Sequence, residues 1–426
     1  MRSLLSTPTR ALRRKIHTAP AAAGSRNPSP PPPTDSAANA NRSIPALFAR
    51  GGTSNGLIIQ RQHLPPLQEQ WHTVLPAAMG APDPVHARQL DGMGGGASST
   101  SKVCVLEPSP SARGDDADVD FTFVQVGVRD GALDFAGNCG NMSAAVGPVA
   151  WDEGLVRGRE GKVVVVKGQD GDGKGEEYRE ALVRVFNTNT SKIIHSRFRV
   201  SGDPPLYCPR GNYAMDGVPG TQSRITLSFL DPGGAKTGKA LPTGNAVDVL
   251  TLADGSQIDA SLVDISNPGV FVRIPDLGTR YADADPTTFT PQAVEADAAL
   301  KARLEAIRQA GAVAMGLDPK IESVPKIVLL FPSPGSAEVD IRCLALSMGQ
   351  AHKAVPLTLA LCLGAAANMP GTLPAQVRGA RDGDGPVVIG HPSGTVEIGA
   401  TFKDGKVVSA DLLRTARVLM KGQVYY

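Results

Sequence analysis

The sequence has no long apolar run and no clustered cysteines or histidines, and these absences exclude several classes of protein. Every apolar stretch is shorter than the roughly 20 residues that a membrane-spanning helix needs. The five cysteines form no CxxC pair, and the seven histidines form no HxxxH pair. The odd number and irregular spacing of the cysteines favour reduced thiols in an intracellular compartment over a disulfide framework. The scattered cysteines and histidines also make a zinc site improbable. We therefore expect no membrane span and no bound metal.

Aromatic residues and net charge are also scarce. Phe, Trp and Tyr make up 4% of the 426 residues, and the net charge is +2, which gives no reason to expect a nucleic-acid partner. Glycine and proline, in contrast, number 47 and 35, as in a chain with many turns between short strands. The length is enough for two domains of about 150 to 200 residues each.

Residues 1–43 have the composition of a targeting segment followed by a linker. The first 26 residues contain six basic side chains, and the first acidic residue is Asp35. This composition is typical of a mitochondrial transit peptide, although a basic tail without a targeting role would look the same. The proline-rich residues 27–33 then form an extended linker. We predict localisation in the mitochondrial matrix, with the cytoplasm as the alternative, and a folded part that starts near Ile44.

From Ile44 onward, short runs rich in β-branched residues alternate with Gly, Pro and Asp, which is the pattern of strands joined by turns. Each half of the chain also contains one segment that is apolar on nearly every side, at about 141–151 and 350–368. A helix of this kind is buried all round. We therefore predict an α+β protein with two similar domains, 44–220 and 221–410, each a rolled β-sheet around a central helix.

Two further helices are predicted at the surface, over 65–80 and 290–316. The second has Thr290 as its N-cap, Pro291 at its first position and Gly316 as its stop. Pro148 lies inside the first apolar helix, where it would kink or shorten the helix.

The densest polar segment is the loop DGMGGGASSTSK, residues 91–102. Its glycines allow close approach of the backbone to a ligand, and its hydroxyls and terminal lysine suit an oxygen-rich anion. It lacks the GxxxxGK[ST] pattern of a phosphate-binding loop, and a surface loop without function is the alternative. Lys102 favours the functional interpretation because it opens the apolar run 103–106, where partial desolvation makes a lysine a usable base.

A second candidate segment, DFAGNCGN at residues 134–141, leads into the first apolar helix. Free backbone N–H groups make a helix N-terminus an anion site and can activate a cysteine placed there. Cys139 is therefore interpreted as a functional thiol, with a core role as the alternative. Cys104 and Cys362 lie among apolar residues and are interpreted as inert core.

Two turns complete the candidate site. RGGTSNG at residues 50–56 follows the first strand and offers an arginine and two hydroxyls, which fit a carboxylate. SMGQAHK at residues 347–353 opens the second apolar helix and places His352 on its first turn, as a ligand contact or as a structural histidine. The two helix N-termini, one per half, would clamp a substrate with two or three carboxylates in one cleft.

Together these motifs resemble the PrpF family. RGGTSNG, DGMGGGASSTSK, FAGNCGNMSAAVGP, NTNTSK, FLDPGGAKTGKALPTGN, NPGVFV, SMGQAHKA, MPGT and HPSGT occur in the family's order between Ile44 and the C-terminus. The resemblance implies a diaminopimelate epimerase-like fold, in which the last strand, within residues 411–426, completes the first domain. It also implies an isomerase of 2-methylaconitate, 3-methylitaconate, aconitate or oxalomesaconate that uses no metal and no organic cofactor.

The resemblance also assigns residues. It implies proton transfer by Lys102 and Cys139, whereas Asn55 stands where the family commonly has lysine, which leaves the particular substrate open. The implied substrate-binding residues belong to the loops described above: Arg50, Gly51, Gly52, Thr53, Ser54, Ser99, Thr100, Ser101, Asn138, Gly140, Asn141, Ser347, Met348 and His352.

We therefore predict a cofactor-independent isomerase of an unsaturated di- or tricarboxylate, with Lys102 as the base and a place in propionate metabolism through the methylcitrate cycle. An aconitate Δ-isomerase or an oxalomesaconate-type tautomerase is the alternative with similar chemistry. A two-thiol amino-acid epimerase is disfavoured because the second helix start has no cysteine. An accessory protein of an iron–sulfur aconitase finds no support in cysteine spacing. The expected partner is a small-molecule polycarboxylate, and a homodimer is possible.

Overall fold

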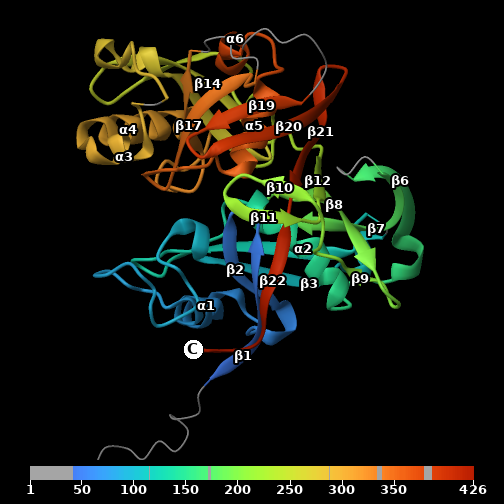
Figure 1. Cartoon of the computed structure of the whole chain (residues 1–426). Helices are drawn as coiled ribbons and strands as arrows, with labels where there is room; N and C mark the ends of the chain where they lie inside the picture. The colour runs from blue at the N-terminus through green and yellow to red at the C-terminus, as the bar shows by residue number, and fades with distance from the viewer. Residues whose placement is uncertain (1–41, 115, 171–173, 287, 333–337, 379–385) are drawn as a thin grey trace, which may run out of the picture. The chain divides into compact units, whose positions relative to one another are not determined.

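Strands are the predominant secondary structure of the computed structural model, which describes residues 42–114, 116–170, 174–286, 288–332, 338–378 and 386–426 (Figure 1). Residues 1–41 of the predicted targeting segment and linker lie outside these ranges, and their role stays a prediction.

In these ranges, 20 strands form one continuous sheet, and two more form a separate hairpin. The first half of the chain contributes β1 (Ser43–Gly51), β2 (Ser54–Gln60), β3 (Lys102–Pro108), β4 (Val119–Val126), β5 (Leu133–Asp134), β6 (Val163–Asp170), β7 (Lys174–Asn187), β8 (Lys192–Ser201), β9 (Leu206–Tyr207) and the hairpin β10 (Tyr213–Met215) and β11 (Val218–Gln222). The second half contributes β12 (Ile225–Leu230), β13 (Asp248–Thr251), β14 (Gln257–Ile265), β15 (Asn267–Arg273), β16 (Lys326–Phe331), β17 (Ile341–Ser347), β18 (Gln350–Ala351), β19 (Val387–His391), β20 (Gly394–Lys403), β21 (Lys406–Arg414) and β22 (Ala416–Tyr425).

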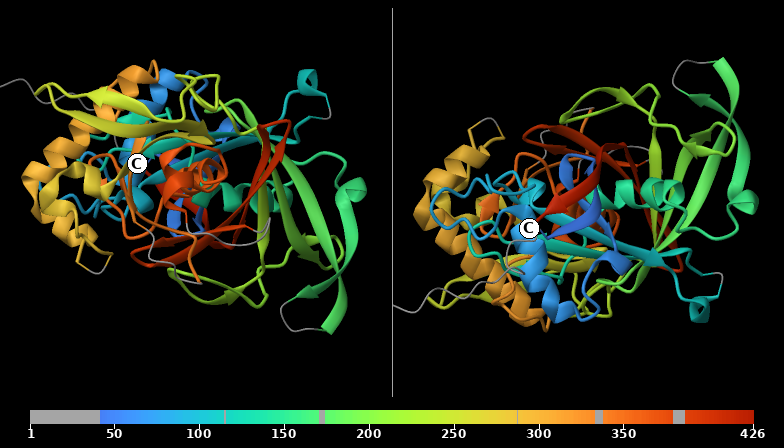
Figure 2. Two further views of the ribbon diagram at one scale, coloured as in Figure 1. Left: turned by 90° about the horizontal axis from the view of Figure 1, so that it is seen from above. Right: turned by 90° about the horizontal axis from the view of Figure 1, so that it is seen from below.

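Two buried helices lie at the centre of these strands. Nearly every residue of α2 (Gly140–Asp152) and every residue of α5 (Leu357–Ala366) is buried. α2 packs against β1, β2, β3, β7, β8 and β22, and α5 packs against β14, β15, β19, β20 and β21; seen from above, α5 lies in the middle of its strands (Figure 2). The predicted α+β fold, with strands rolled around one helix per half, is confirmed. Pro148 does not shorten α2.

The two halves repeat the same strand order around their helices. β1 and β2 form an antiparallel hairpin, β3 pairs parallel to β2, and β4 pairs antiparallel to β3. β14, β15, β16 and β17 follow the same sequence of pairings. The register of the parallel pairs sets Gly56 against Lys102 and Gly269 against Lys326. The third strand of each repeated unit, β3 and β16, therefore begins with a lysine.

Hydrogen-bonded strands connect the two halves. β22, the last strand, pairs antiparallel with β1 from Ser43 opposite Tyr425 to Gly51 opposite Ala416. β12 pairs with β8 on one side and with β21 on the other. Residues 42–426 form one compact unit, so the division at residue 220 stays a prediction.

The remaining helices differ from expectation at their ends. α1 (Trp71–Met79) ends at Gly80 in the left-handed conformation. The helix predicted over 290–316 begins with Thr290 accepting from the Ala293 N–H, but it is two helices, α3 (Pro291–Ala296) and α4 (Ala298–Ala314). The Asp297 side chain accepts from the Leu300 N–H at 3.0 Å and caps a new helix there. A short α6 (Leu373–Val377) follows α5.

The second central helix starts later than predicted. Residues 350–356 form β18 and a loop, and α5 begins at Leu357 with Pro356 as its N-cap. Proline disfavours helical geometry in the residue before it and lacks an N–H group, so it suits the start of a helix, and Pro356 delays the start of α5. The placement of His352 on a helix was therefore wrong. No helix in the described ranges is long and apolar enough to cross a membrane.

Candidate active site

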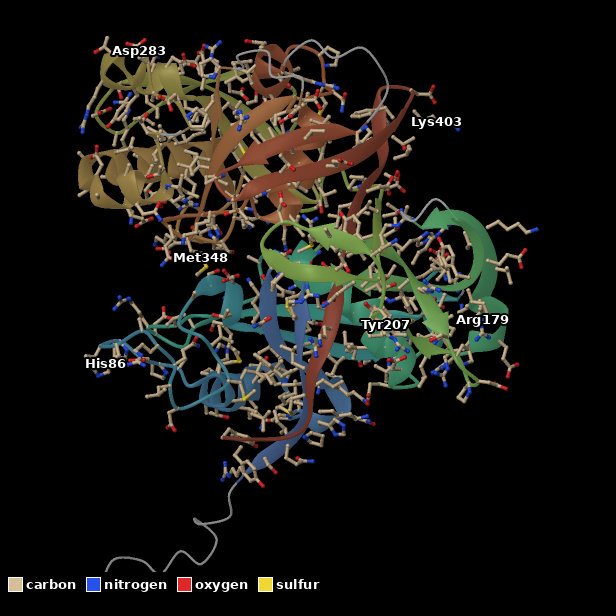
Figure 3. All side chains as sticks on the ribbon, viewed as in Figure 1. His86, Arg179, Tyr207, Asp283, Met348 and Lys403 are labelled. Carbon is tan, nitrogen blue, oxygen red and sulfur yellow. The ribbon has the colours of Figure 1, made fainter. Side chains whose placement is uncertain are left out.

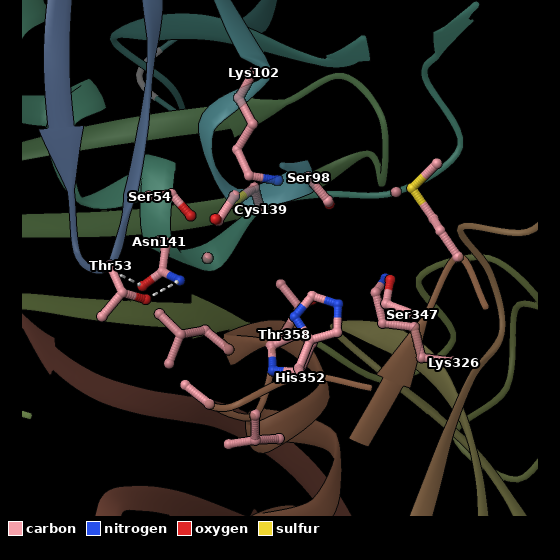
Figure 4. A pocket seen from close by; sticks show the side chains of 18 of the residues that line it. Thr53, Ser54, Ser98, Lys102, Cys139, Asn141, Lys326, Ser347, His352 and Thr358 are labelled. Atoms are coloured by element: carbon pink, nitrogen blue, oxygen red, sulfur yellow. Dashed lines mark hydrogen bonds between the residues drawn. The ribbon is translucent and has the colours of Figure 1, made fainter. Parts of the chain in front are cut away.

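A cavity of about 450 Å³ lies where the N-terminal ends of α2 and α5 meet (Figure 4). The two helix ends touch closely, because a β-carbon added at Gly140 would lie 2.8 Å from the β-carbon of Leu357. Most of the predicted site residues line this cavity: Thr53, Ser54, Ser99, Lys102, Asn138, Cys139, Gly140, Asn141, Ser347, Met348 and His352.

Lys102 reaches into the cavity from the start of β3. Its side chain is buried, and its Nζ donates to the Gln125 Oε1 at 2.7 Å and lies 5.2 Å from the centre of the Phe123 ring. The Gln125 amide is itself held, because its Nε2 donates to the Ser101 carbonyl at 2.8 Å. The Lys102 amine is thus fixed in position, and among the described residues no carboxylate is hydrogen-bonded to it.

Cys139 is the N-cap residue of α2 and is half-buried. Its N–H donates to the Asn138 side chain at 2.7 Å. In the next turn, the Asn141 side chain donates to the Thr53 hydroxyl at 3.1 Å and accepts from the Thr53 N–H at 3.2 Å (Figure 4). The hairpin between β1 and β2 is thereby attached to the start of the helix, whose first N–H groups have no partner within the helix. Such a helix start can bind an anion, and its role as a carboxylate-binding site stays a prediction.

The second half supplies the opposite wall, with Lys326, Ser347 and His352 facing Lys102 (Figure 4). Burial, and then the nearby Lys102, lower the pKa of Lys326 to about 8. Burial, followed by both lysines, lowers the pKa of His352 to about 4. His352 is therefore neutral at pH 7. Met348 reaches from this wall toward the first half (Figure 3), and its φ of 51° belongs to the tight turn between β17 and β18.

Five predicted residues do not line the cavity but support it: Arg50, Gly51, Gly52, Thr100 and Ser101. The Arg50 guanidinium donates to the Gly52 carbonyl at 2.7 Å and to the Thr415 hydroxyl at 3.0 Å, which ties β1 to the segment before β22. Gly51 and Gly52 pack against Asn141, where a side chain would collide. Ser101 is fully buried and donates to the Val126 carbonyl, and the Thr100 hydroxyl donates to Ala97.

Two of the other cysteines, Cys104 and Cys362, belong to the core. Cys104 and Cys362 are fully buried and unpaired, and burial raises the pKa of both thiols, as expected of core residues. The described residues contain no group of three or more His, Cys, Asp or Glu that could hold a metal ion.

Among the cavity residues that sequence reasoning missed are Gln125, Ser323 and Lys326. A signal for Lys326 was present, because it opens the apolar strand KIVLLF as Lys102 opens KVCVL. Gln125 had no such signal, since its role depends on the register that sets it opposite Lys102.

Comparison with known proteins extends this picture. A family profile described as "PrpF protein" matches residues 41–426. The chain belongs to the PrpF family. It is 36% identical to a 3-methylitaconate isomerase of Eubacterium barkeri, over 90% of this chain and 97% of the relative. It is 37% identical to a (4E)-oxalomesaconate Δ-isomerase of Novosphingobium sp. strain KA1, with 90% and 97% covered. A 2-methyl-aconitate isomerase of Shewanella oneidensis is 32% identical, with 89% and 96% covered.

Solved structures agree with the family assignment. A crystal structure of methylitaconate-Δ-isomerase matches with a TM-score of 0.68 at 36% identity, over 90% of this chain and 96% of that one. A hydroxyproline epimerase from Agrobacterium vitis matches with a TM-score of 0.50 at 14% identity, with 90% and 93% covered, and this likeness shows the epimerase-like fold alone. The PrpF relatives named here are isomerases, and this chain is an isomerase of the PrpF type.

Proposed function

We propose that this PrpF protein isomerises an unsaturated di- or tricarboxylate, such as 2-methylaconitate or aconitate, by moving a proton between two carbons, with Lys102 as the base. The observation that carries the proposal is the buried Lys102 amine, held by Gln125 in a cavity between two helix N-termini. The relatives named for methylitaconate, oxalomesaconate and 2-methyl-aconitate all act on acids of this class.

The proposed reaction is an isomerisation, so it consumes no second substrate. Acting as the base, the Lys102 amine takes a proton from an allylic carbon, and the electron pair left behind spreads through the double bond onto a conjugated carboxylate. The free N–H groups at the start of α2 stabilise this charge as it forms. The Lys102 ammonium then returns the proton at the other end of the allyl system. Alternatively, the Cys139 thiol donates a proton there and ends as the thiolate; the Lys102 ammonium then releases its proton to solvent, and the thiolate takes one up, so both groups are restored.

The two-thiol epimerase alternative finds no partner cysteine in the cavity. The start of α5 offers Pro356, Leu357 and Thr358 where α2 offers Cys139. Thr358 is a poor proton carrier compared with a thiol. An accessory role for an iron–sulfur aconitase gains no supporting feature from the described residues, and we do not pursue it.

The test is proton NMR of 2-methylaconitate, aconitate, 3-methylitaconate and oxalomesaconate in D2O. We expect Lys102→Ala to lower turnover of the preferred acid by roughly 10²- to 10⁴-fold, the usual loss on removing a general base. Cys139→Ser should be milder, and the exposed Lys320→Ala should match the wild type. Near-normal turnover by Lys102→Ala would show that another group is the base.

We also propose that residues 1–43 direct the protein to the mitochondrial matrix, on the composition described above. Fusion of this segment to a fluorescent protein tests the proposal, and a cytoplasmic signal would contradict it.

A further inference from the structure

The wall opposite Lys102 contains a lysine that the proposed reaction does not yet use. Lys326 begins β16 with a side chain only 8% exposed. Its Nζ donates to the Ser323 carbonyl at 2.8 Å, and within the described residues no carboxylate forms an ion pair with it. An ammonium has three donors, so Lys326 keeps donor capacity that faces the cavity.

Two neighbours on this wall also have polar atoms that are shielded and unpartnered. The Ser323 Oγ and the His352 Nε2 are both buried without a hydrogen-bond partner, and both residues line the cavity. A buried polar atom without a hydrogen-bond partner lowers the stability of the folded protein. A ligand in the cavity can supply the missing partners. Ser347 adds a hydroxyl from the end of β17, the strand that pairs antiparallel with β16, and it also lines the cavity.

The charges of this wall decide which ligand group it attracts. His352 was expected to contact a carboxylate, but it is neutral, since burial and the two lysines lower its pKa to about 4. Lys353 also lines the cavity, but its side chain is exposed at the rim. Lys326 is thus the buried cation of this wall, and attraction for an anion depends on it.

We propose that Lys326, Ser323 and Ser347 form a second carboxylate subsite, which holds one carboxylate of the substrate across the cavity from Lys102 and the start of α2. The inference rests on the proposed function and sharpens it: the substrate must carry at least two carboxylates, one for each wall. Binding at the Lys326 subsite orients the allylic carbon toward the Lys102 amine. Lys326 is a substrate-binding residue in this account and transfers no proton.

Binding of a carboxylate at this subsite also depends on pH. Lys102 on β3, Asp134 on β5, Cys139 at the start of α2 and His352 after β18 all face Lys326. Burial and Lys102 lower the pKa of Lys326 to about 8, while Asp134 and Cys139 act in the opposite direction. The free enzyme therefore loses the ammonium as the pH rises above about 8, and affinity for the polycarboxylate falls with it.

The probe is tricarballylate, a saturated tricarboxylate with no double bond to isomerise, titrated calorimetrically into the full-length protein. We expect Lys326→Met to weaken its binding roughly tenfold to a hundredfold, as for loss of a charged hydrogen bond. The wild-type affinity should fall above about pH 8, and Lys326→Arg should retain binding there. The matched control Lys320→Met, an exposed lysine six residues earlier, should bind as the wild type does.

The outcomes separate this inference from the proposed function. Tricarballylate binding that depends on Lys326 supports the subsite. If no unsaturated acid is turned over, that result contradicts the proposed function alone. Equal binding by Lys326→Met and wild type overturns the subsite, as does failure of the wild type to bind at millimolar concentration. Normal binding by Lys326→Met with loss of deuterium exchange would make Lys326 a proton carrier and also overturn it. Should Lys326→Met fail to fold, Lys326→Arg decides through its pH profile.

Discussion

The contact between the starts of α2 and α5 holds the two walls of the cavity together, and Gly140→Ala perturbs it directly. The added methyl would lie 2.8 Å from the Leu357 β-carbon and 3.4 Å from the Thr358 nitrogen. Carbon atoms in van der Waals contact are about 3.5–4.0 Å apart, so the helix ends must separate by roughly 1 Å. Overpacking of this kind costs about 1–3 kcal/mol. Replacing glycine with alanine also lowers the chain entropy of the unfolded state, which stabilises the folded protein by only about 0.4–1 kcal/mol. The net effect on the free energy of unfolding is therefore destabilising.

The effect on activity should exceed the effect on stability. Cys139 and Thr358 flank this contact and line the cavity, and a misplacement of about 1 Å near a reaction centre can cost on the order of 10²-fold. We expect kcat/KM of Gly140→Ala to fall about tenfold to a hundredfold, with cooperative urea unfolding retained.

Two further variants control this experiment. Gly161→Ala should leave both quantities unchanged, because nothing lies within 4 Å of a β-carbon there. Leu357→Gly removes the opposing β-carbon, so the double variant should lose less than the sum of the two single variants. Activity and unfolding free energy of Gly140→Ala within error of the wild type would refute the reasoning.

Two more changes test the surroundings of Lys102. Gln125→Glu places a carboxylate where the Lys102 Nζ now donates at 2.7 Å. An ion pair with this carboxylate opposes the function of the lysine as a base, so kcat/KM at neutral pH should fall by roughly tenfold or more. An unchanged kcat/KM would contradict Lys102 as the base. Asn55 lies on β2 outside the cavity lining, beside Ser54, which lines it. Successive residues of a strand face opposite ways, so Asn55→Lys should change kcat/KM by less than about threefold, and a change of preferred acid would show the opposite.

The strand pattern and the two apolar segments were enough to predict the fold. β-branched runs bounded by turns identify strands locally, and a segment apolar on all sides can only be buried. Helix limits were less predictable. Asp297 divides one expected helix into two, and Pro356 delays the start of α5. A capping residue or a proline acts on single backbone groups, and the spacing of apolar residues does not reveal such effects.

The site was predicted where its residues are neighbours in sequence and missed where they are not. Lys102 and Cys139 lie in polar loops that precede buried elements, and both line the cavity. Arg50 sits in an equally suggestive loop, but its guanidinium is used by Gly52 and Thr415. Lys326 opens an apolar strand as Lys102 does, but it was missed because Ser347 and His352, two of its neighbours on the wall, come from β17 and the loop after β18.

The central claim is that Lys102 moves a proton within an unsaturated polycarboxylate, and deuterium exchange tests it most directly. Wild-type protein and Lys102→Met are incubated with the preferred acid in D2O and followed by proton NMR. We predict that the wild type forms an isomer and incorporates deuterium at an allylic carbon, while Lys102→Met, though folded and able to bind tricarballylate, does neither. Exchange by Lys102→Met at the wild-type rate would contradict the account.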